Sequence, residues 1–354
     1  MIKCITAPRL HMAFSILTVT ALVGCTNIGL NQDEAAAEES SQSQASDALP
    51  SFGKNDQSPG FFRMKLGNYT VTALYDGYVE MDSKLFKGRP QATINRLLKQ
   101  SKQPSPMKTP VNAFLLDDGR QVILVDAGGS ASLSNSMGKL ISSLKMSGYQ
   151  PADVSAVLLT HLHPDHTGAL AQDGAMVFPN AQLYVPLAEA AHWLAADRRS
   201  GDMPFYQGTH LAVAPYQQAG QFHTFTQNSS PLPSIQAISL PGHTPGHTAY
   251  RVRSGGESLL LWGDTVYSFA LQLADPLISV DFDQDNKKSR FARTKMLQEA
   301  ALSGEWIAGA HMPFPGIGQV LAAGKASYRW LPVDYSRALP NPQPEAAPAV
   351  LTAH

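Results

Sequence analysis

The chain has almost no cysteine. Of its 354 residues only Cys4 and Cys25 are cysteines, and both lie within the first 25 positions. The rest of the chain therefore has neither a disulfide nor a thiolate that could bind a metal or act as a nucleophile. Any metal site there must be built from histidine and carboxylate side chains, and any nucleophile must be an oxygen.

An excess of either charge is also absent. There are 27 Lys and Arg residues against 28 Asp and Glu residues, and the calculated pI is about 6.8. This balance provides no broad electrostatic field for nucleic acid or for an anionic membrane surface. We therefore expect a small-molecule substrate and no nucleic-acid partner.

Residues 1–25 resemble an export signal. Lys3 and Arg9 precede an apolar run over residues 12–23, which is too short to span a bilayer as a mature helix. The signal closes with Leu-Val-Gly-Cys, which resembles the bacterial lipoprotein signal in which the cysteine is lipidated. With Cys25 lipidated, we expect an exported, periplasmic lipoprotein anchored in the outer membrane. The alternative is an ordinary cleaved signal.

Composition divides the remaining chain into three parts. Residues 26–58 are rich in Ala, Glu, Ser, Gln and Asp, and residues 339–354 are rich in Pro and Ala. Neither segment has enough bulky apolar side chains to offset the entropy lost on ordering. We expect a flexible tether and a disordered tail, with residues 59–338 as the folded domain.

Within that domain, strand-like and helix-like stretches alternate, which indicates sheets covered by helices. Asp76-Gly77 is expected to be a hairpin turn after the first strand. Residues 205–216 are expected to be an irregular aromatic segment, either a lid or a pocket wall. The expected strands are residues 69–74, 111–116, 121–125, 157–159, 181–185, 235–240, 248–253, 259–262, 306–310 and 328–333, and the expected helices are residues 137–146, 187–198 and 286–302.

Three imidazoles and a carboxylate follow one of these strands directly. The sequence over residues 158–168 is Leu-Leu-Thr-His-Leu-His-Pro-Asp-His-Thr-Gly. Pro164 and Gly168 force the chain into a tight loop at the strand end. Neutral imidazole and carboxylate are natural ligands for a borderline divalent metal. The stretch therefore predicts a metal site.

Other predicted strands end in the same way. Asp126, His243, Asp264 and His311 each follow an apolar run. Strands that stop at such residues can converge on one edge of packed sheets, where sites are usually built. For Asp126 an alternative stays open, because a carboxylate at this position could also cap the next helix.

On these residues the chain resembles the metallo-β-lactamase superfamily. The superfamily signature His-x-His-x-Asp-His corresponds to residues 161–166, and Gly242-His243, Gly263-Asp264 and His311 match its later elements. Within the superfamily the chain is similar to methyl parathion hydrolase and the N-acyl-homoserine lactonases. The supporting stretches are residues 58–64, 242–247, 313–318 and 328–336.

The resemblance implies an α/β fold, an αββα sandwich of the metallo-β-lactamase type, with two divalent metal ions, expected to be zinc, between the sheet edges. It also suggests a homodimer. Asp126 would orient a ligand, and His247 would support the site without binding metal. Carried over by position, one metal would be bound by His161, His163 and His243, the other by Asp165, His166 and His311, with Asp264 bridging them.

The implied activity is hydrolysis, with a metal-bridging hydroxide as nucleophile and Asp165 and Asp264 as catalytic carboxylates. His163 stands where flavin-linked diiron relatives carry an acidic residue, which favours hydrolysis over oxygen reduction. Lactones or small apolar aryl esters are the expected substrates. Two alternatives stay open: an organophosphate triesterase of the methyl parathion hydrolase type, and a lipoprotein that binds metal or ligand without turnover.

Three residues are candidates for the substrate pocket. Leu133, Trp193 and Phe205 fall where organophosphate-hydrolysing relatives have aromatic walls. Leu133 replaces an expected aromatic residue, which disfavours phosphotriesters. The alternative is that these side chains are plain core, and His192 and Trp193 are expected to serve helix surface and packing.

Overall fold

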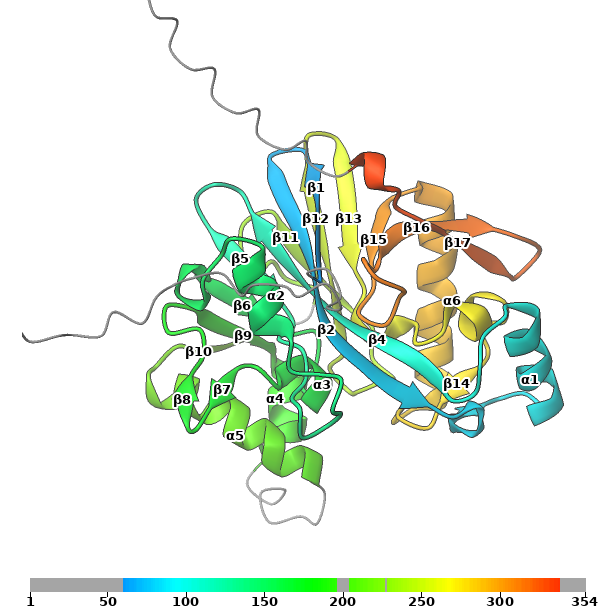
Figure 1. Ribbon diagram of the computed structural model, residues 1–354, viewed down its shortest axis with the longest axis horizontal. Helices are drawn as coiled ribbons and strands as arrows, with labels where there is room; N and C mark the ends of the chain where they lie inside the picture. The colour runs from blue at the N-terminus through cyan, green and yellow to red at the C-terminus, as the bar shows by residue number, and fades with distance from the viewer. Residues whose placement is uncertain (1–59, 196–203, 227, 338–354) are drawn as a thin grey trace, which may run out of the picture. The chain divides into compact units, whose positions relative to one another are not determined.

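The computed structural model describes residues 60–195, 204–226 and 228–337, all within one compact unit, Ala48–His354 (Figure 1). The expected signal with Cys25, the tether and the tail lie outside the described residues, so these domain boundaries stay predictions. Within the described ranges, no helix is both long and apolar enough to cross a membrane.

Two β-sheets form the centre of the unit. The first has seven strands in the order β1-β2-β4-β5-β6-β9-β10, and the second has six in the order β11-β12-β13-β15-β16-β17. The first sheet consists of β1 (Phe61–Leu66), β2 (Tyr69–Met81), β4 (Met107–Asp117), β5 (Val122–Val125), β6 (Ala156–Leu158), β9 (Gln182–Pro186) and β10 (Phe222–Phe225). The second consists of β11 (Ile235–Ser239), β12 (Thr248–Ser254), β13 (Glu257–Leu261), β15 (Trp306–Ala308), β16 (Ile317–Ala322) and β17 (Tyr328–Pro332).

The central strands are apolar on both faces because both faces are buried. In β4, Phe114 and Leu116 belong to the core between the two sheets, whereas Ala113 and Leu115 belong to the core on the outer side. Side chains along a strand alternate between its faces, so a near-continuous apolar run suits a strand covered on both sides. The same reason explains the apolar run that precedes the histidine cluster.

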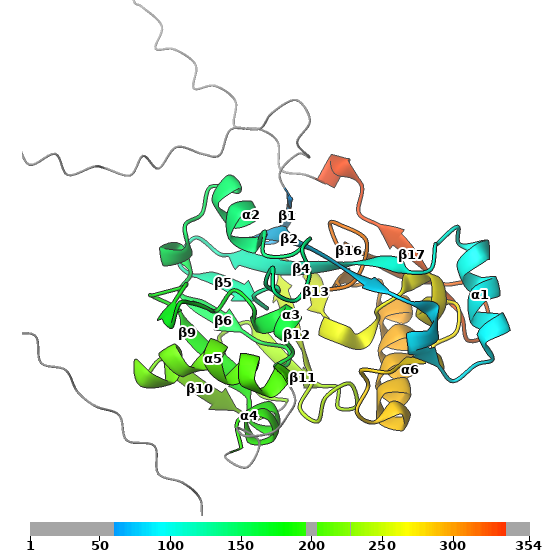
Figure 2. The ribbon, with the colours of Figure 1, turned by 60° about the horizontal axis from the view of Figure 1, so that its bottom comes forward.

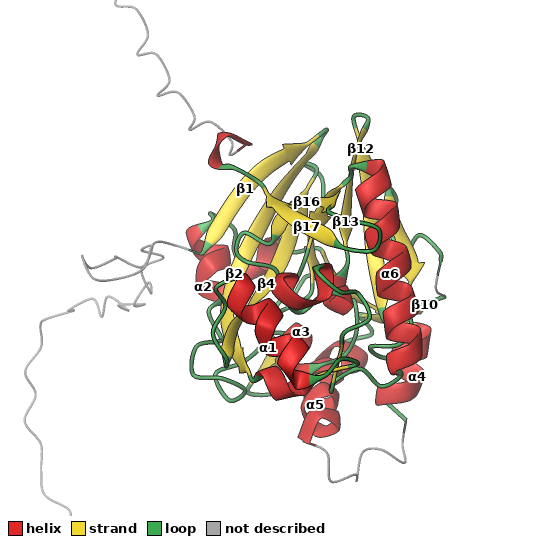
Figure 3. Cartoon of the chain, turned by 90° about the vertical axis from the view of Figure 1, so that its right-hand side faces the viewer, coloured by secondary structure: helices red, strands yellow, loops and turns green. Residues whose placement is uncertain are grey.

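Helices cover the outer faces of both sheets. The first sheet carries α2 (Leu140–Met146), α4 (Leu187–Trp193) and α5 (Pro204–Gln218), while the second carries α6 (Asn286–Ser303). Figure 2 shows α4 and α5 along the β9–β10 end of the first sheet, and Figure 3 shows α2 and α6 on the outer sides of the two sheets. The predicted αββα sandwich is confirmed.

The remaining elements join or flank these layers. Strand β3 pairs with β14, and β7 pairs with β8. The bounds are β3 (Phe86–Lys87), β7 (Ala171–Gln172), β8 (Ala175–Met176), β14 (Ser279–Val280), α1 (Gln91–Gln100) and α3 (Pro164–Thr167), with 3₁₀ turns at Ser83–Leu85, Pro151–Asp153, Gly263–Thr265 and Tyr335–Arg337 and a π-helical turn at Phe269–Leu273.

Several sequence predictions are confirmed with small shifts at the ends. The strands expected at residues 111–116 and 121–125 form the hairpin β4–β5, and those expected at residues 248–253 and 259–262 form the hairpin β12–β13. Helix α6 lies where expected, because Asp285 accepts hydrogen bonds from the backbone N–H groups of Lys287 and Lys288 at its start. It ends at Gly304, whose left-handed backbone (φ 65°) suits glycine.

The hairpin turn predicted at Asp76-Gly77 is wrong. Strand β2 continues through it to Met81, with only a bulge between Tyr75 and Gly77. The Asp76 carboxylate is buried and accepts hydrogen bonds from the backbone N–H groups of Gly129 (2.9 Å) and Leu140 (2.8 Å). A residue type common in turns here serves a long-range contact.

Three helical predictions are also corrected. The helix expected at residues 137–146 begins only at Leu140, after Gly138 with φ +84°. Helix α4 ends at Trp193, and residues 196–203 lie outside the described part. The segment expected to be irregular is helix α5. Its buried residues recur at helical spacing, at Tyr206, Thr209, Val213 and Tyr216.

The close approach of α3 to the loop after β5 gives a prediction of stability. A Cβ on Gly168 would lie 2.3 Å from the carbonyl carbon of Gly129. The substitution Gly168→Ala must push the two loops apart, so we expect it to lower the free energy of unfolding by about 1–3 kcal/mol, measured by urea denaturation. The control is Gly208→Ala on α5, where nothing lies within 4 Å of the added Cβ and helix propensity favours alanine. Equal stability of the two variants would contradict this packing.

Candidate metal centre

Loops from both sheets meet at one edge of the sandwich. Asp126 follows β5 and His161 follows β6, both in the first sheet. His243, Asp264 and His311 follow β11, β13 and β15 of the second sheet. The predicted convergence of strand ends is therefore present.

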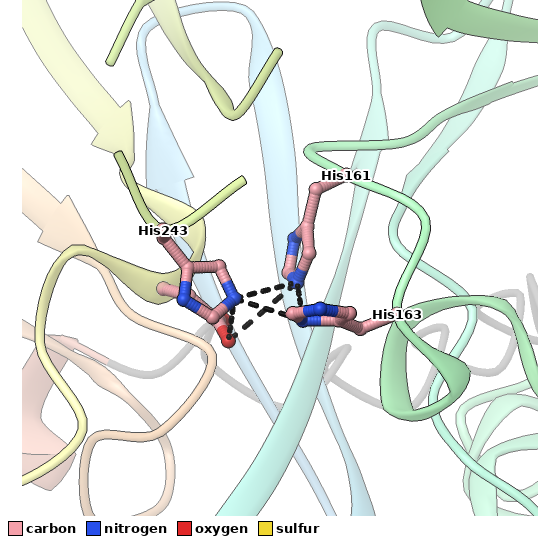
Figure 4. A group of neighbouring side chains, drawn as sticks. His161, His163 and His243 are labelled. Atoms are coloured by element: carbon pink, nitrogen blue, oxygen red, sulfur yellow. Dashed lines mark hydrogen bonds and ion pairs between the residues drawn. The ribbon is translucent and has the colours of Figure 1, made fainter. Parts of the chain in front are cut away.

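One group of side chains brings three imidazoles to a point. His161 Nε2 lies 3.0 Å from His163 Nδ1 and 3.2 Å from His243 Nε2, and the last two atoms are 2.9 Å apart (Figure 4). Asp264 Oδ2 lies 3.4 Å from His243 Nε2. A tetrahedral zinc ion with bonds of 2.0–2.1 Å separates its ligand nitrogens by about 3.3 Å. This spacing fits a small divalent cation.

A second group shares the same carboxylate. Asp264 Oδ1 lies 3.0 Å from His166 Nε2 and 3.2 Å from His311 Nε2, and Asp165 Oδ2 lies 3.5 Å from His311 Nε2. Within each group, all four ligand atoms lie within 4.8 Å of one another. His166 Nε2 and Asp264 Oδ1 are buried, and neither is aligned for a hydrogen bond with a described residue. Buried polar atoms without hydrogen bonds are expected where lone pairs bind a cation.

Electrostatics favours neutral imidazoles, the form that binds a metal, in the first group. Burial, together with neighbouring imidazoles, lowers the pKa of His161 and of His163 well below the usual value, so both rings are neutral. In the second group, burial alone would lower the pKa of His166, but the Asp264 and Asp126 carboxylates raise it well above the usual value. A metal ion bound there would displace this proton.

Comparison with known proteins now identifies the family. Residues 107–311, more than half of the chain, match the model of the metallo-beta-lactamase superfamily. The chain belongs to the metallo-beta-lactamase superfamily. Membership supports the prediction of a metal-dependent hydrolase.

Individual superfamily members resemble the chain to different extents. The crystal structure of hydrolase AbOPH of the beta lactamase superfamily is 36% identical, covers 79% of this chain and 99% of its own, and has a TM-score of 0.75. AidC, a dizinc quorum-quenching lactonase solved with a product, is 24% identical at the same coverages, with a TM-score of 0.71, and shows the fold alone. N-acyl homoserine lactonase AttM of Agrobacterium fabrum is 31% identical over 137 residues, or 36% of this chain. The chain spans 47% of the length of that lactonase.

Asp126 contacts the second group of candidate ligands. Its Oδ2 lies 2.8 Å from His166 Nδ1, and its Oδ1 accepts a hydrogen bond of 2.8 Å from the backbone N–H of Thr160. The contact fixes the orientation of the His166 ring. The alternative of a helix cap is wrong, because the N-cap of the next helix is Lys139.

His247 supports the backbone of the shared carboxylate. Its Nε2 accepts a hydrogen bond of 2.9 Å from the backbone N–H of Asp264, and its Nδ1 lies 3.2 Å from the carbonyl oxygen of Leu240. Burial and the nearby His243 lower the pKa of His247 to about 3. It belongs to neither group of converging ligand atoms. That the seven predicted ligands bind metal stays a prediction.

Three residues at the centre were missed from the sequence. The Tyr267 hydroxyl donates to Asp264 Oδ2, and the Tyr267 ring stacks on His311 at 4.6 Å. Asp283 Oδ1 lies 3.2 Å from His243 Nδ1. Glu189 accepts hydrogen bonds from the backbone N–H groups of Leu162 (3.2 Å) and Gly246 (2.7 Å), which joins the loops of His161 and His243. Of the three, only Tyr267 could have been found from the local sequence, because it lies three residues after Asp264.

Two of the three predicted pocket residues lie together. Leu133 and Phe205 line a pocket of about 550 Å³ beside α3, and the Phe205 ring lies 6.4 Å from the His163 ring. Trp193 does not line this pocket. It is buried in the outer core, as the packing alternative predicted, with its ring 5.1 Å from that of His163. Neither the lining of this pocket nor that of a larger cavity of about 760 Å³, near Arg251 and Trp306, includes a candidate ligand.

The first prediction for this centre concerns metal content. His163→Ala removes one donor of the first group, so we expect the zinc-loaded protein to lose one of two ions, measured by mass spectrometry on gel-filtered samples. The control is His223→Ala, because His223 contacts Gln182 on the first sheet and no candidate ligand. Equal zinc content in His163→Ala and the parent would contradict the ligand assignment.

The second prediction concerns acid stability of the metal-free protein. His247 stays neutral when folded, whereas in the unfolded chain its pKa returns to about 6.5. The unfolded state therefore binds more protons, and stability is lost as pH falls below about 6.5. In the His247→Gln variant the side chain cannot be protonated, and its amide oxygen can still accept from the backbone N–H of Asp264.

The two proteins are compared by urea denaturation. Between about pH 7.5 and about pH 5.5, the parent should lose about 1.4 kcal/mol more than His247→Gln. Comparing the change with pH cancels any constant effect of the substitution on stability. Equal losses would show that His247 titrates normally in the fold.

Proposed function

We propose that the protein is a hydrolase with two divalent metal ions that cleaves lactones or small apolar esters. The observation that carries the proposal is that one buried carboxylate, Asp264, is shared by two groups of converging donor atoms. When bound, a pair of such ions lowers the pKa of a water molecule and polarises a carbonyl oxygen. We propose zinc as the metal, in keeping with the His and Asp donors.

The open side of the site is defined by exposure of its ligands. The Asp165 side chain is 17% exposed, whereas those of Asp264 and His311 are fully buried. A substrate would therefore approach beside Asp165, whose carboxylate can orient an attacking water or accept its proton. Tyr267 lies behind this position, because its hydroxyl contacts Asp264 and lies 3.2 Å from His243 Nε2. Burial and Asp264 raise the pKa of Tyr267 well above its usual value, so the hydroxyl stays a hydrogen-bond donor.

The pocket beside α3 supports an apolar, uncharged substrate. Leu133, Phe205 and Leu211 contribute apolar surface to it. Asp173 is the one charged residue among its described lining, and no Lys or Arg is present to bind an anionic group. A lactone with an apolar substituent or an aryl ester suits such a wall. A phosphotriester is the second candidate, because Phe205 could contact an aryl leaving group.

Export and a lipid anchor at Cys25 are part of the proposal on sequence grounds alone. In that case the enzyme would act in the periplasm on substrates that diffuse through the outer membrane. A non-catalytic binding role is the remaining alternative.

The test is a substrate panel with the zinc-loaded protein: a lactone carrying an acyl chain, an aryl ester and an aryl dialkyl phosphotriester. We expect kcat/KM for the lactone or ester to exceed that for the phosphotriester. Asp264→Ala should reduce turnover to background, whereas Glu299→Gln, which removes an exposed carboxylate paired with Lys295 and lies outside the pocket and both groups of candidate ligands, should not. Phe205→Ala should raise KM for the preferred apolar substrate about tenfold, the loss of roughly 1.4 kcal/mol of apolar contact.

Each outcome separates the alternatives. Dominant phosphotriester turnover would favour the second candidate. Two bound zinc ions with no turnover of any substrate would favour the binding role. Turnover in Asp264→Ala equal to the parent would contradict the mechanism.

A further inference from the structure

A buried arginine lies behind the centre and outside both groups of candidate ligands. Arg293 on α6 is 1% exposed. Its Nε donates to the carbonyl oxygen of Thr265 (2.8 Å), its Nη1 to those of Ile278 (2.6 Å) and Pro276 (3.3 Å), and its Nη2 to Ser289 Oγ (2.9 Å) and Asp283 Oδ2 (3.4 Å). The five N–H groups of a guanidinium thus meet five acceptors.

Through these contacts Arg293 is linked to both candidate ligands that the second sheet contributes to the first group, His243 and Asp264. Asp283 Oδ2 accepts a hydrogen bond from Arg293 Nη2, and Asp283 Oδ1 lies 3.2 Å from His243 Nδ1. Thr265, whose carbonyl oxygen accepts from Nε, directly follows the shared carboxylate residue Asp264. One side chain is therefore linked to an imidazole ligand of the first group and to the backbone beside the bridging ligand.

Holding a loop with a buried guanidinium is energetically costly. Desolvating a charged group costs several kcal/mol, and apolar residues of similar volume often stabilise a fold as well or better. What apolar side chains cannot do is orient a carboxylate. A carboxylate that accepts from a metal-binding imidazole fixes its ring orientation and raises its basicity. The planar fork of arginine holds that carboxylate in place from the other side.

We propose that Arg293 is a positioning residue for the metal centre, acting on His243 through Asp283. The inference rests on the proposed function insofar as it takes the converging groups to be metal sites. The five acceptors of Arg293 include none of the candidate ligands. Its substitution should weaken metal binding before it affects anything else in the reaction.

The test measures zinc affinity by competition with a chromophoric chelator, together with the melting temperature of the metal-free protein. In Arg293→Lys a single ammonium with three donors replaces the fork and cannot satisfy the five acceptors of Arg293. We expect the zinc ion of the first group, which includes His243, to bind about 10- to 100-fold less tightly, the range seen when a partner of a metal ligand is removed. The loss of zinc affinity should be larger than any fall in the melting temperature of the metal-free protein accounts for.

The matched control is Arg251→Lys. Arg251 is also largely buried and forms a two-point ion pair with Glu305, at 2.8 Å for each contact, but it contacts no candidate ligand. The control should lose stability and keep the zinc affinity of the parent. Equal weakening of zinc binding in both variants would reduce Arg293 to an ordinary structural residue and overturn the proposal.

A second variant covers the case in which Arg293→Lys does not fold. Asp283→Asn keeps the shape of the side chain, but an NH₂ donor replaces one of the two oxygens, so either the contact with His243 or the one with Arg293 is lost. We expect the same weakening of zinc binding, and in the double variant the two effects should not add, because they break one path. A folded Asp283→Asn protein with the zinc affinity of the parent overturns the proposal. If the parent itself binds no zinc, the metal centre fails first, which is a distinct result.

Discussion

The candidate metal centre packs histidine and aspartate side chains closely together in a space from which water is largely excluded. Five imidazoles and two carboxylates converge from both sheets, and most of these side chains are fully buried. Their donor atoms face one another at about hydrogen-bond distance, and His166 Nε2 and Asp264 Oδ1 have no aligned partner in the described structure. Such an arrangement is unfavourable without a cation, so the surrounding fold must hold each group against its neighbours.

The holding contacts join loops that are far apart in sequence. Asp126 connects the loop after β5 to His166, and Glu189 on α4 connects the loop of His161 to the loop of His243. Asp283 reaches His243 from the segment before α6. These carboxylates are buried and accept from backbone N–H groups or imidazoles, which stabilises the loops without adding a ligand to either group. Rigidity of this kind is what a catalytic metal site requires.

The sequence indicated the candidate ligands but not the residues that support them, for a physical reason. The candidate ligands lie in loops that follow apolar strands, so the local pattern, together with the resemblance to the superfamily signature, indicated them. Glu189 and Asp283 lie in a helix and in a connecting segment, and their importance comes from partners 27 to 57 residues away. Asp76 was misassigned for the same reason, because a carboxylate that accepts from Gly129 resembles a turn residue locally. Helix α5 was missed although its buried positions have helical spacing, since Gly208 and Pro215 within it suggest an irregular chain.

The two sheets contribute to both groups, which couples metal binding to the packing of the sandwich. The first group combines His161 and His163 of the first sheet with His243 and Asp264 of the second, and the second group combines Asp165 and His166 with His311 and the same Asp264. An ion bound in either group would therefore link the edges of the sheets as well as complete a site. A ligand that binds only the folded state stabilises it in proportion to its affinity and concentration. In this fold that stabilisation would act between the sheets, at the edge where the loops are held by buried polar contacts and the interior apolar core no longer reaches.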